Sequence, residues 1–266
     1  MDVIVTDLDG TLLDARDYSF AEAAGALALI RERRIPLVFC TSKTRAETER
    51  WREALGNRDP FITENGGALF APPGLLPVPE GATRRGEYVA IELGAPYAHL
   101  VSVLGEASRE SRCRIRGFAE MQASEVAEAC SMSLADAELA KQREYDEPFL
   151  ILDSSRERHL LDAIEERGLK CSRGGRFRHI TGRSDKAAAV RILIDLYRRA
   201  YGGIRTIGLG DGPNDAAFLE CVDAPFIIRS PLAGLVAREA PRAAITESEG
   251  VRGWNQAILR LFAEKP

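Results

Sequence analysis

The sequence predicts an α/β protein with a Rossmann-like, doubly wound parallel sheet and an inserted α+β unit. Two apolar segments, 3–6 and 204–209, each run into an acidic turn that contains glycine. Short apolar segments alternate with amphipathic ones around them, which is typical of parallel strands joined by crossover helices. The composition changes after 72–79, a stretch dense in Pro and Gly, which indicates the start of a second unit.

The first predicted strand, Val3–Thr6, ends at two carboxylates, Asp7 and Asp9. Ligands of an open α/β sheet bind beyond the carboxyl ends of its strands, so we expect Asp7 at the crevice. Gly10 allows a tight turn that brings Asp9 beside it. Because paired carboxylates repel phosphate, we predict Mg²⁺ between them, with Asp7 as nucleophile and Asp9 as general acid and base. A simple Asp-Gly turn is the alternative.

A second apolar strand, Ile204–Leu209, leads to an acidic turn and to a helix that opens at Pro213. Parallel strands carry their carboxyl ends to one edge, so we predict Asp211 as a third metal position. Asn214 and Asp215 are expected to close the site by holding the ion or its waters. The alternative for this segment is a helix cap without metal chemistry.

The remaining elements follow in order along the chain. One crossover helix over 20–33 fills the interval before the strand that precedes Thr41, so no further unit fits there. A helix over 45–55, a strand over 61–63 and a turn over 64–67 continue the alternating pattern. Further on, a helix begins near Ser184, and an amphipathic helix closes the chain over 251–262.

The inserted unit is predicted over 82–182, which divides the core into 1–81 and 183–266. Its predicted strands are 88–93, 149–152, 170–173 and 176–180, the last two forming a hairpin about Gly174-Gly175. Its predicted helices are 97–109, 124–130, 133–143 and 156–167.

Composition narrows the class of protein. The 266 residues are 45% hydrophobic and contain no apolar segment long enough to span a bilayer. The chain starts directly in a predicted strand without a signal-peptide pattern. We therefore expect a cytoplasmic protein with no membrane partner. A net charge of -4 with dispersed cations argues against nucleic-acid binding. Five scattered cysteines indicate neither a disulfide framework nor a zinc site. The sequence leaves the oligomeric state open.

The two acidic motifs, 7–11 and 210–215, resemble the first and last motifs of the haloacid dehalogenase superfamily of phosphohydrolases. The resemblance implies that Mg²⁺ binds Asp7, the carbonyl of Asp9 and Asp211. It also implies that Thr41 contacts the transferring phosphoryl group and that Lys186 neutralises its charge. An insert after the second motif resembles enzymes of this superfamily with an α/β cap of type IIB, which select small phosphorylated metabolites, often sugars.

Four further segments, 41–45, 64–67, 143–148 and 174–179, resemble the mannosyl-3-phosphoglycerate phosphatase family over nearly the whole chain. That substrate implies carboxylates for sugar hydroxyls and guanidinium groups for the glycerate carboxylate. The substrate-binding candidates of the core are Ser42, Lys43, Arg45 and Asn65. Those of the insert are Glu144 and Glu147 for the sugar, Arg143 and Arg176 as anion clamps, and His179 as a hydrogen-bond donor. A solvated helix end or a packed structural histidine is the alternative for the charged cap residues.

The same framework leaves other functions open. Sucrose-phosphate and hexose-phosphate phosphatases and phosphomannomutases share these motifs, and a mutase returns the phosphoryl group to sugar instead of water. A metabolite sensor without turnover is the non-enzyme alternative. Competent side chains at 7, 9, 41 and 186 favour an enzyme over a sensor. The resemblance of the four further segments favours a small phosphorylated sugar-glycerate as its substrate.

Overall fold

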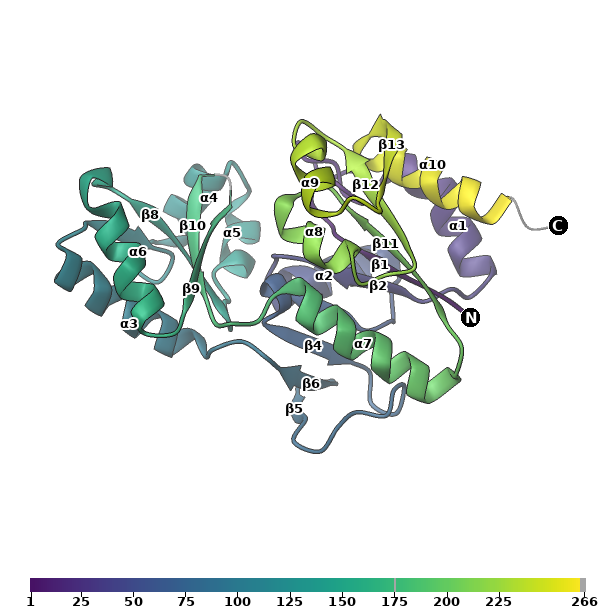
Figure 1. Ribbon diagram of the computed structural model, residues 1–266, viewed down its shortest axis with the longest axis horizontal. Coiled ribbons are helices and arrows are strands. Elements are labelled where there is room, and N and C mark those ends of the chain that lie inside the picture. Colours follow the sequence, from purple (N-terminus) through teal and green to yellow (C-terminus); the bar gives the residue numbers. More distant parts are fainter. Residues whose placement is uncertain (175, 264–266) are drawn as a thin grey trace.

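The computed structural model describes residues 1–174 and 176–263, which form two lobes lying side by side (Figure 1). The strands of the larger lobe are β1 (Asp2–Thr6), β2 (Leu37–Cys40), β3 (Phe61–Thr63), β4 (Ala68–Ala71), β5 (Thr83–Arg85), β6 (Tyr88–Glu92), β11 (Arg205–Gly210), β12 (Ala224–Arg229) and β13 (Ala244–Glu249). They form one sheet in the order β13-β12-β11-β1-β2-β3-β4-β6-β5.

The strands from β13 to β3 run parallel. Strands that follow β1 early in the chain are added on one side of it, and strands that come late are added on the other. Strand β2 adds to one side of β1 and β11 to the other, so the carboxyl ends of β1 and β11 meet at a topological switch point. This part of the sheet confirms the predicted doubly wound α/β class.

Helices cover both faces of the larger sheet. Helices α1 (Ala24–Glu32) and α10 (Gly250–Ala263) pack on the face that receives Ile4, with α2 (Arg45–Leu55) at its edge. Helices α7 (Lys186–Tyr201), α8 (Pro213–Leu219) and α9 (Ala233–Glu239) pack on the face that receives Val3 and Val5. Alternate residues of β1 therefore belong to two different hydrophobic clusters, as expected for a strand buried on both faces.

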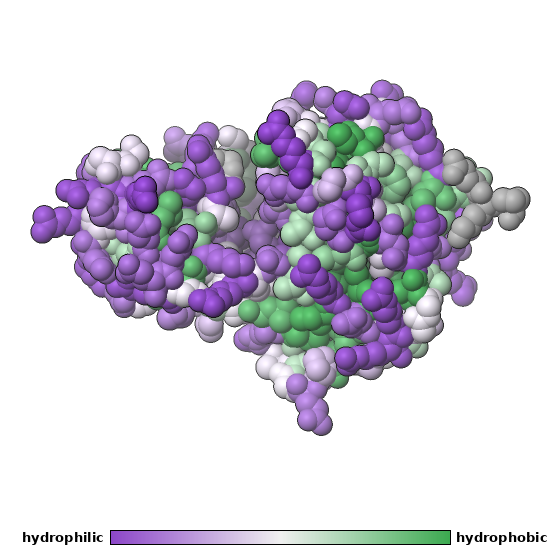
Figure 2. Space-filling model, viewed as in Figure 1, coloured by the Kyte–Doolittle hydropathy of each residue, from purple (hydrophilic) through white to green (hydrophobic). Residues whose placement is uncertain are grey.

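The smaller lobe contains β7 (Ile115–Gly117), β8 (Asp146–Ile151), β9 (Lys170–Gly174) and β10 (Phe177–Thr181) as an antiparallel sheet in the order β7-β8-β10-β9. Helices α3 (Tyr97–Ser111) and α6 (Glu157–Glu166) pack on the face of Phe149, and α4 (Ala123–Cys130) and α5 (Leu134–Ala140) on the face of Leu150. Figure 2 shows mainly hydrophilic residues over the visible face of this lobe. Its buried apolar side chains fill two clusters of its own.

Short 3-10 turns complete the described elements: η1 (Ala21–Ala23), η2 (Glu64–Gly66) and η3 (Ser154–Arg156). The sequence places the boundary of the inserted unit at residue 82, whereas β5 and β6 extend the larger sheet. Strand β6 pairs antiparallel with β4, with Ala68 opposite Glu92, so the chain leaves this sheet only after Glu92. We propose that the inserted unit spans about 93–182. Gly175, in the predicted hairpin turn, lies outside the described residues.

In the described part of the chain, none of the helices combines the length and the apolar character that a membrane crossing requires. All five cysteines are free thiols, and Cys40 and Cys113 are buried.

Helix α10 packs against the C-terminal end of β1. Trp254 is fully buried, and its indole N–H donates to Thr6 Oγ1 at 3.0 Å. The Thr6 hydroxyl in turn donates to the carbonyl of Asp7 at 2.8 Å. The C-terminal helix therefore fixes the backbone at the position where the first acidic motif begins.

We expect Trp254→Ala to reduce the free energy of unfolding by about 3–5 kcal/mol, because it leaves a large cavity beneath β1. Urea unfolding measures the loss. Trp254→Phe is the matched control, since it keeps most of the ring volume and should cost less. A loss below about 1 kcal/mol for the alanine variant would show that α10 does not support β1 as described.

Candidate active site

Two strand ends bring the acidic motifs together. Asp7 directly follows β1 and Asp211 directly follows β11, and the backbone N–H of Asp7 donates to the carbonyl of Leu209 at 2.9 Å. Thr6 lies opposite Leu209 in the parallel register. The motifs, far apart in the sequence, thus meet at the switch point of the sheet, where the sequence predicts them.

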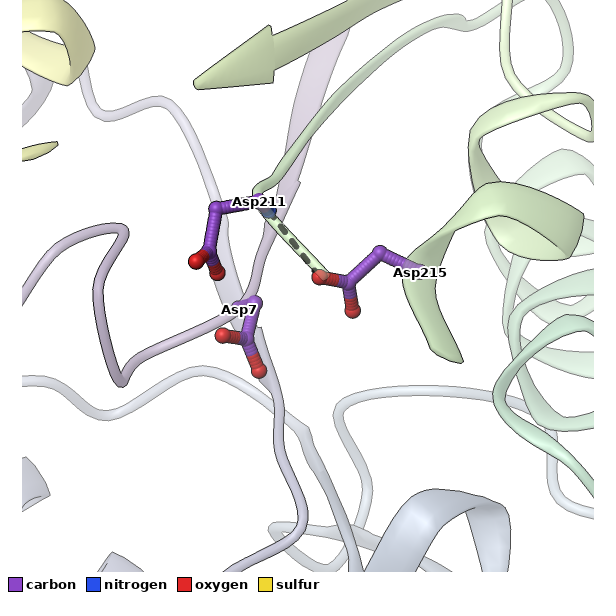
Figure 3. A group of neighbouring side chains, drawn as sticks. All are labelled: Asp7, Asp211 and Asp215. Atoms are coloured by element: carbon purple, nitrogen blue, oxygen red, sulfur yellow. Dashed lines mark hydrogen bonds between the residues drawn. The ribbon is translucent and has the colours of Figure 1, made fainter. Parts of the chain in front are cut away.

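Three carboxylates converge there. Asp7, Asp211 and Asp215 each offer an oxygen, and these oxygens lie within 4.8 Å of one another. Figure 3 shows the three side chains approaching one another from β1, β11 and α8. Asp215 Oδ2 also accepts from the backbone N–H groups of Asp211 at 3.0 Å and Gly212 at 2.9 Å, which fixes its direction. Grouped carboxylate oxygens are the donors that hard divalent cations prefer.

Lys186 supplies the positive charge of this group. Its side chain is 1% exposed, and Nζ lies 2.7 Å from both Asp7 Oδ1 and Asp215 Oδ1. Burial alone would lower the pKa of Lys186, but the carboxylates of Asp215 and Asp7 outweigh burial and raise it. The lysine therefore stays charged at the first position of α7, where the side chain of Asp185 caps the helix by accepting from Ala188 N at 2.8 Å.

The carboxyl groups have shifted pKa values. Burial raises the pKa of Asp7, an effect that Lys186 opposes and that Asp215 and Asp211 increase. Burial and the neighbouring Asp215 raise the pKa of Asp211 to about 6. Both pKa values are raised because like charges lie close together where little solvent reaches them. A bound cation would stabilise the charged forms of these carboxyl groups.

The first acidic turn lies directly against Asp211. Gly10 has a φ of 73°, and a Cβ at this position would lie 2.7 Å from Asp211 Oδ2, so only glycine fits. The hydroxyl of Thr11 donates to Asp211 Oδ1 at 3.1 Å. The sequence does not single out this role of Thr11, although its place in the first motif is the signal that points to it.

The Asp9 side chain does not join the three carboxylates. It turns to Lys43, whose Nζ lies 2.9 Å from Asp9 Oδ1, and it stays 39% exposed. The carbonyl contact predicted for Asp9 and its role as acid and base stay predictions. Thr41 follows β2 at the same edge of the sheet and is fully buried, with Oγ1 accepting from the backbone N–H of Lys43 at 3.2 Å.

The η2 loop carries Asn65 to the second acidic motif. Asn214 Nδ2 donates to Asn65 Oδ1 at 3.0 Å, which joins this loop to the second acidic motif. Gly66 has a φ of 93°, and a Cβ there would lie 2.2 Å from the carbonyl of Asp185. The loop therefore packs against the start of α7, the helix that carries Lys186.

Glu64 joins the same loop to the smaller lobe. Its carboxylate is buried and accepts from the backbone N–H groups of Glu144 at 3.0 Å and Tyr145 at 2.8 Å. Burial raises the pKa of Glu64 to about 7, against the opposing charge of Arg143. The sequence does not predict this role for Glu64; its place in the Glu-Asn-Gly-Gly turn is the available signal.

The smaller lobe reaches the core through two of the predicted cap residues. The guanidinium of Arg143 donates to the carbonyl of Ser42 at 3.0 Å and lies 3.6 Å from Asp146. Glu144 Oε2 accepts from Arg45 Nε at 3.0 Å. The structure therefore places four of the predicted substrate-binding residues, Ser42, Arg45, Arg143 and Glu144, in two contacts between the lobes.

The other cap candidates have partners within the smaller lobe. The buried carboxylate of Glu147 accepts from the hydroxyl of Tyr97 at 2.7 Å and from the backbone N–H of Ala119 at 3.0 Å. The guanidinium of Arg176 is exposed and donates to a carbonyl of α4 at 2.5 Å. His179 Nδ1 lies 2.9 Å from the fully buried Asp146. Substrate contacts of these three residues stay predictions.

Comparison with known proteins agrees with this geometry. Residues 4–72 match the family model of the haloacid dehalogenase-like hydrolases. The chain is 39% identical to the glucosyl-3-phosphoglycerate/mannosyl-3-phosphoglycerate phosphatase of Methanococcoides burtonii, over 98% of this chain and 97% of that protein. It is 37% identical to the protein of the same name from Persephonella marina, again over 98% of this chain and 97% of the relative.

A solved structure supports the fold. A phosphatase of the haloalkanoate enzyme superfamily from Bacteroides thetaiotaomicron superposes with a TM-score of 0.68 at 18% identity, covering 99% of this chain and 95% of that chain. The resemblance drawn from the sequence motifs is thus confirmed by relatives that match along nearly the whole chain. The chain belongs to the mannosyl-3-phosphoglycerate phosphatase family of the haloacid dehalogenase-like hydrolases.

Proposed function

We propose that this protein is a Mg²⁺-dependent phosphatase that hydrolyses mannosyl-3-phosphoglycerate to mannosylglycerate and phosphate. The observation that carries the proposal is the buried Lys186, held 2.7 Å from both Asp7 and Asp215 beside the carboxylate of Asp211. Such a group offers a nucleophile, a charge partner for it and oxygen ligands for a cation. Because the Methanococcoides burtonii relative carries both substrates in its name, glucosyl-3-phosphoglycerate is the second candidate.

The chain's own residues account for the two chemical steps. Lys186 holds Asp7 Oδ1, so Oδ2 is the oxygen that attacks phosphorus. The bond from phosphorus to the C3 oxygen of glycerate breaks, and Asp9 passes a proton to that oxygen. Water then attacks the aspartyl-phosphate while Asp9 takes its proton, which releases phosphate and restores Asp7.

Further groups of the site would balance the negative charge of the transferring phosphoryl group. A divalent cation held by Asp7 and Asp211 would neutralise oxygens of the transferring group. Thr41, at the end of β2, and the ammonium of Lys186 would add a hydrogen bond and a positive charge on the protein side. We propose that Asn214, which is bonded to Asn65, orients this loop and not the cation itself.

A substrate panel tests the proposed function. We expect the highest kcat/KM of phosphate release for mannosyl-3-phosphoglycerate or glucosyl-3-phosphoglycerate, and much lower values for sucrose-6-phosphate and mannose-6-phosphate. The same assay detects isomerised sugar phosphate, the product of a mutase. A preference for either of the last two substrates would overturn the substrate assignment, and absence of turnover with all four would favour a sensor.

Removal of the nucleophile tests the chemistry. Asp7→Asn keeps the shape of the side chain but removes the attacking carboxylate, so we expect kcat to fall by about 10³-fold or more. A melting curve close to that of the parent protein shows that the fold is intact. Activity within a few-fold of the parent would contradict the assignment of Asp7.

The raised carboxyl pKa values predict how pH acts on metal binding. Below about pH 6 Asp211 carries a proton that a cation must displace, so the apparent Mg²⁺ affinity should rise with pH and level off above that value. Without metal, the folded state binds this proton more tightly than the unfolded chain does. The contribution of Asp211 to stability in EDTA should therefore fall as pH rises from 3.8 to about 6.

Calorimetric Mg²⁺ titrations at several pH values, together with unfolding curves in EDTA, measure both effects. Asp211→Asn is the matched variant, since it removes one of the two metal-binding carboxyl groups with raised pKa values and should weaken both dependences. A Mg²⁺ affinity that does not change between pH 5 and pH 7, a range spanning roughly one unit on either side of this pKa, would contradict the prediction.

A further inference from the structure

A cavity lies where the two lobes meet, beside the predicted acid and base. It has a volume of about 140 Å³ and opens between α2 of the larger lobe and α5 of the smaller lobe, which face each other across the junction in Figure 1. One wall is aromatic: the rings of Tyr18 and Trp51 have centroids 5.9 Å apart with planes inclined by 36°. Met132 and Leu139 line the cavity from the smaller lobe.

The polar lining suits a neutral ligand. Three carboxylates, those of Asp17, Glu47 and Asp136, face the cavity together with two cations, Lys43 and Arg50. Glu47 Oε1 lies 3.8 Å from Lys43 Nζ, and Arg50 forms an ion pair with Asp136 across the lobes. Because the cations are paired and acids are in excess, the cavity disfavours a phosphate or a carboxylate. The carboxylates instead offer hydrogen-bond acceptors to the hydroxyl groups of a ligand, and the ammonium and guanidinium groups offer donors.

Lys43 connects the cavity to the reaction. Its ammonium lies 2.9 Å from Asp9 Oδ1 and 4.6 Å from the centroid of the Tyr18 ring. Because Lys43 both contacts Asp9 and lines the cavity, a group attached near the leaving oxygen, which Asp9 protonates under the proposed function, would extend past Lys43 into the cavity. In a 2-O-hexosyl-3-phosphoglycerate that group is the hexosyl ring, carried by the carbon next to the one that bears the leaving oxygen.

The size of the cavity fits one ring. At about 30 Å³ per water molecule, the volume holds roughly five waters, which suits a single pyranose ring but not a disaccharide. A pyranose has an apolar C–H face, which an aromatic wall can cover, and a rim of hydroxyls, which the charged groups can reach.

We propose that this cavity is the subsite for the hexosyl ring, with Trp51 and Tyr18 on its C–H face and the carboxylates of Glu47 and Asp136 accepting from its hydroxyls. The proposal rests on the proposed function. It assigns sugar recognition to side chains of α2, α5 and the loop after β1. Since both lobes contribute walls, the sugar is bound only when the lobes are together.

A pair of substrates separates sugar recognition from catalysis. Mannosyl-3-phosphoglycerate carries the ring, and 3-phosphoglycerate has the same phosphate and carboxylate without it. We expect Trp51→Ala to lower kcat/KM for the first by about 10-fold to 100-fold and to leave the value for the second within about threefold, since only contacts to the ring are lost. Tyr201→Ala is the matched control, because Tyr201 is a 49% exposed aromatic of α7 outside the cavity.

The outcomes are distinguishable. Equal losses on both substrates, or no loss on the hexosylated one, would overturn the subsite. If the parent protein itself does not prefer hexosyl-3-phosphoglycerates in the substrate panel, the proposed function fails whatever the variants do. Melting curves of Trp51→Ala and of the more conservative Trp51→Phe show whether a loss comes from unfolding.

A binding measurement without turnover gives an independent test. The chain has two tryptophans, of which Trp254 is fully buried beneath β1 and Trp51 borders the cavity. Titration with mannosylglycerate, the product without phosphate, should change the tryptophan emission in a saturable way. Trp51→Phe should abolish the change and Tyr201→Ala should keep it. An unchanged emission in the parent protein at millimolar product would overturn the proposal.

Discussion

The buried ammonium of Lys186 is the constraint on which the site depends. Asp7 and Asp215 are nearly inaccessible to solvent, and two such carboxylates beside Asp211 would repel one another without a cation. Lys186 offsets this repulsion through two contacts of 2.7 Å. Its position is set by the start of α7, so the placement of one helix decides whether the carboxylates can stay together and charged.

The loop that packs on the start of α7 also joins the site to the smaller lobe. Gly66 allows its close approach to α7, Asn65 bonds Asn214 of the second acidic motif, and Glu64 accepts from the backbone of residues 144 and 145. Movement of the smaller lobe therefore changes the surroundings of a loop in contact with the catalytic group. The physical link is a short series of hydrogen bonds, of which those accepted by the buried carboxylate of Glu64 are the most costly to leave unpaired.

Much of this arrangement is predictable from local sequence. An apolar strand followed by an acidic, glycine-containing turn predicts Asp7 and Asp211 at one edge, and helix α2 is found over Arg45–Leu55 as predicted because Thr44 and Gly56 mark its ends. Pairing of β4 with β6 is not predictable in this way, since it depends on partners distant along the chain. The direction of cap side chains likewise depends on tertiary contacts, as the internal partners of Glu147 show.

The most direct test of the account is to locate the cation. Mn²⁺ takes similar oxygen ligands to Mg²⁺ and scatters anomalously, so a crystal soaked with Mn²⁺ shows its position independently of the protein coordinates. The account predicts one strong anomalous peak bridging the carboxylates of Asp7 and Asp211, with Lys186 still bonded to Asp7. A peak elsewhere, or none between these two side chains, would contradict the central claim.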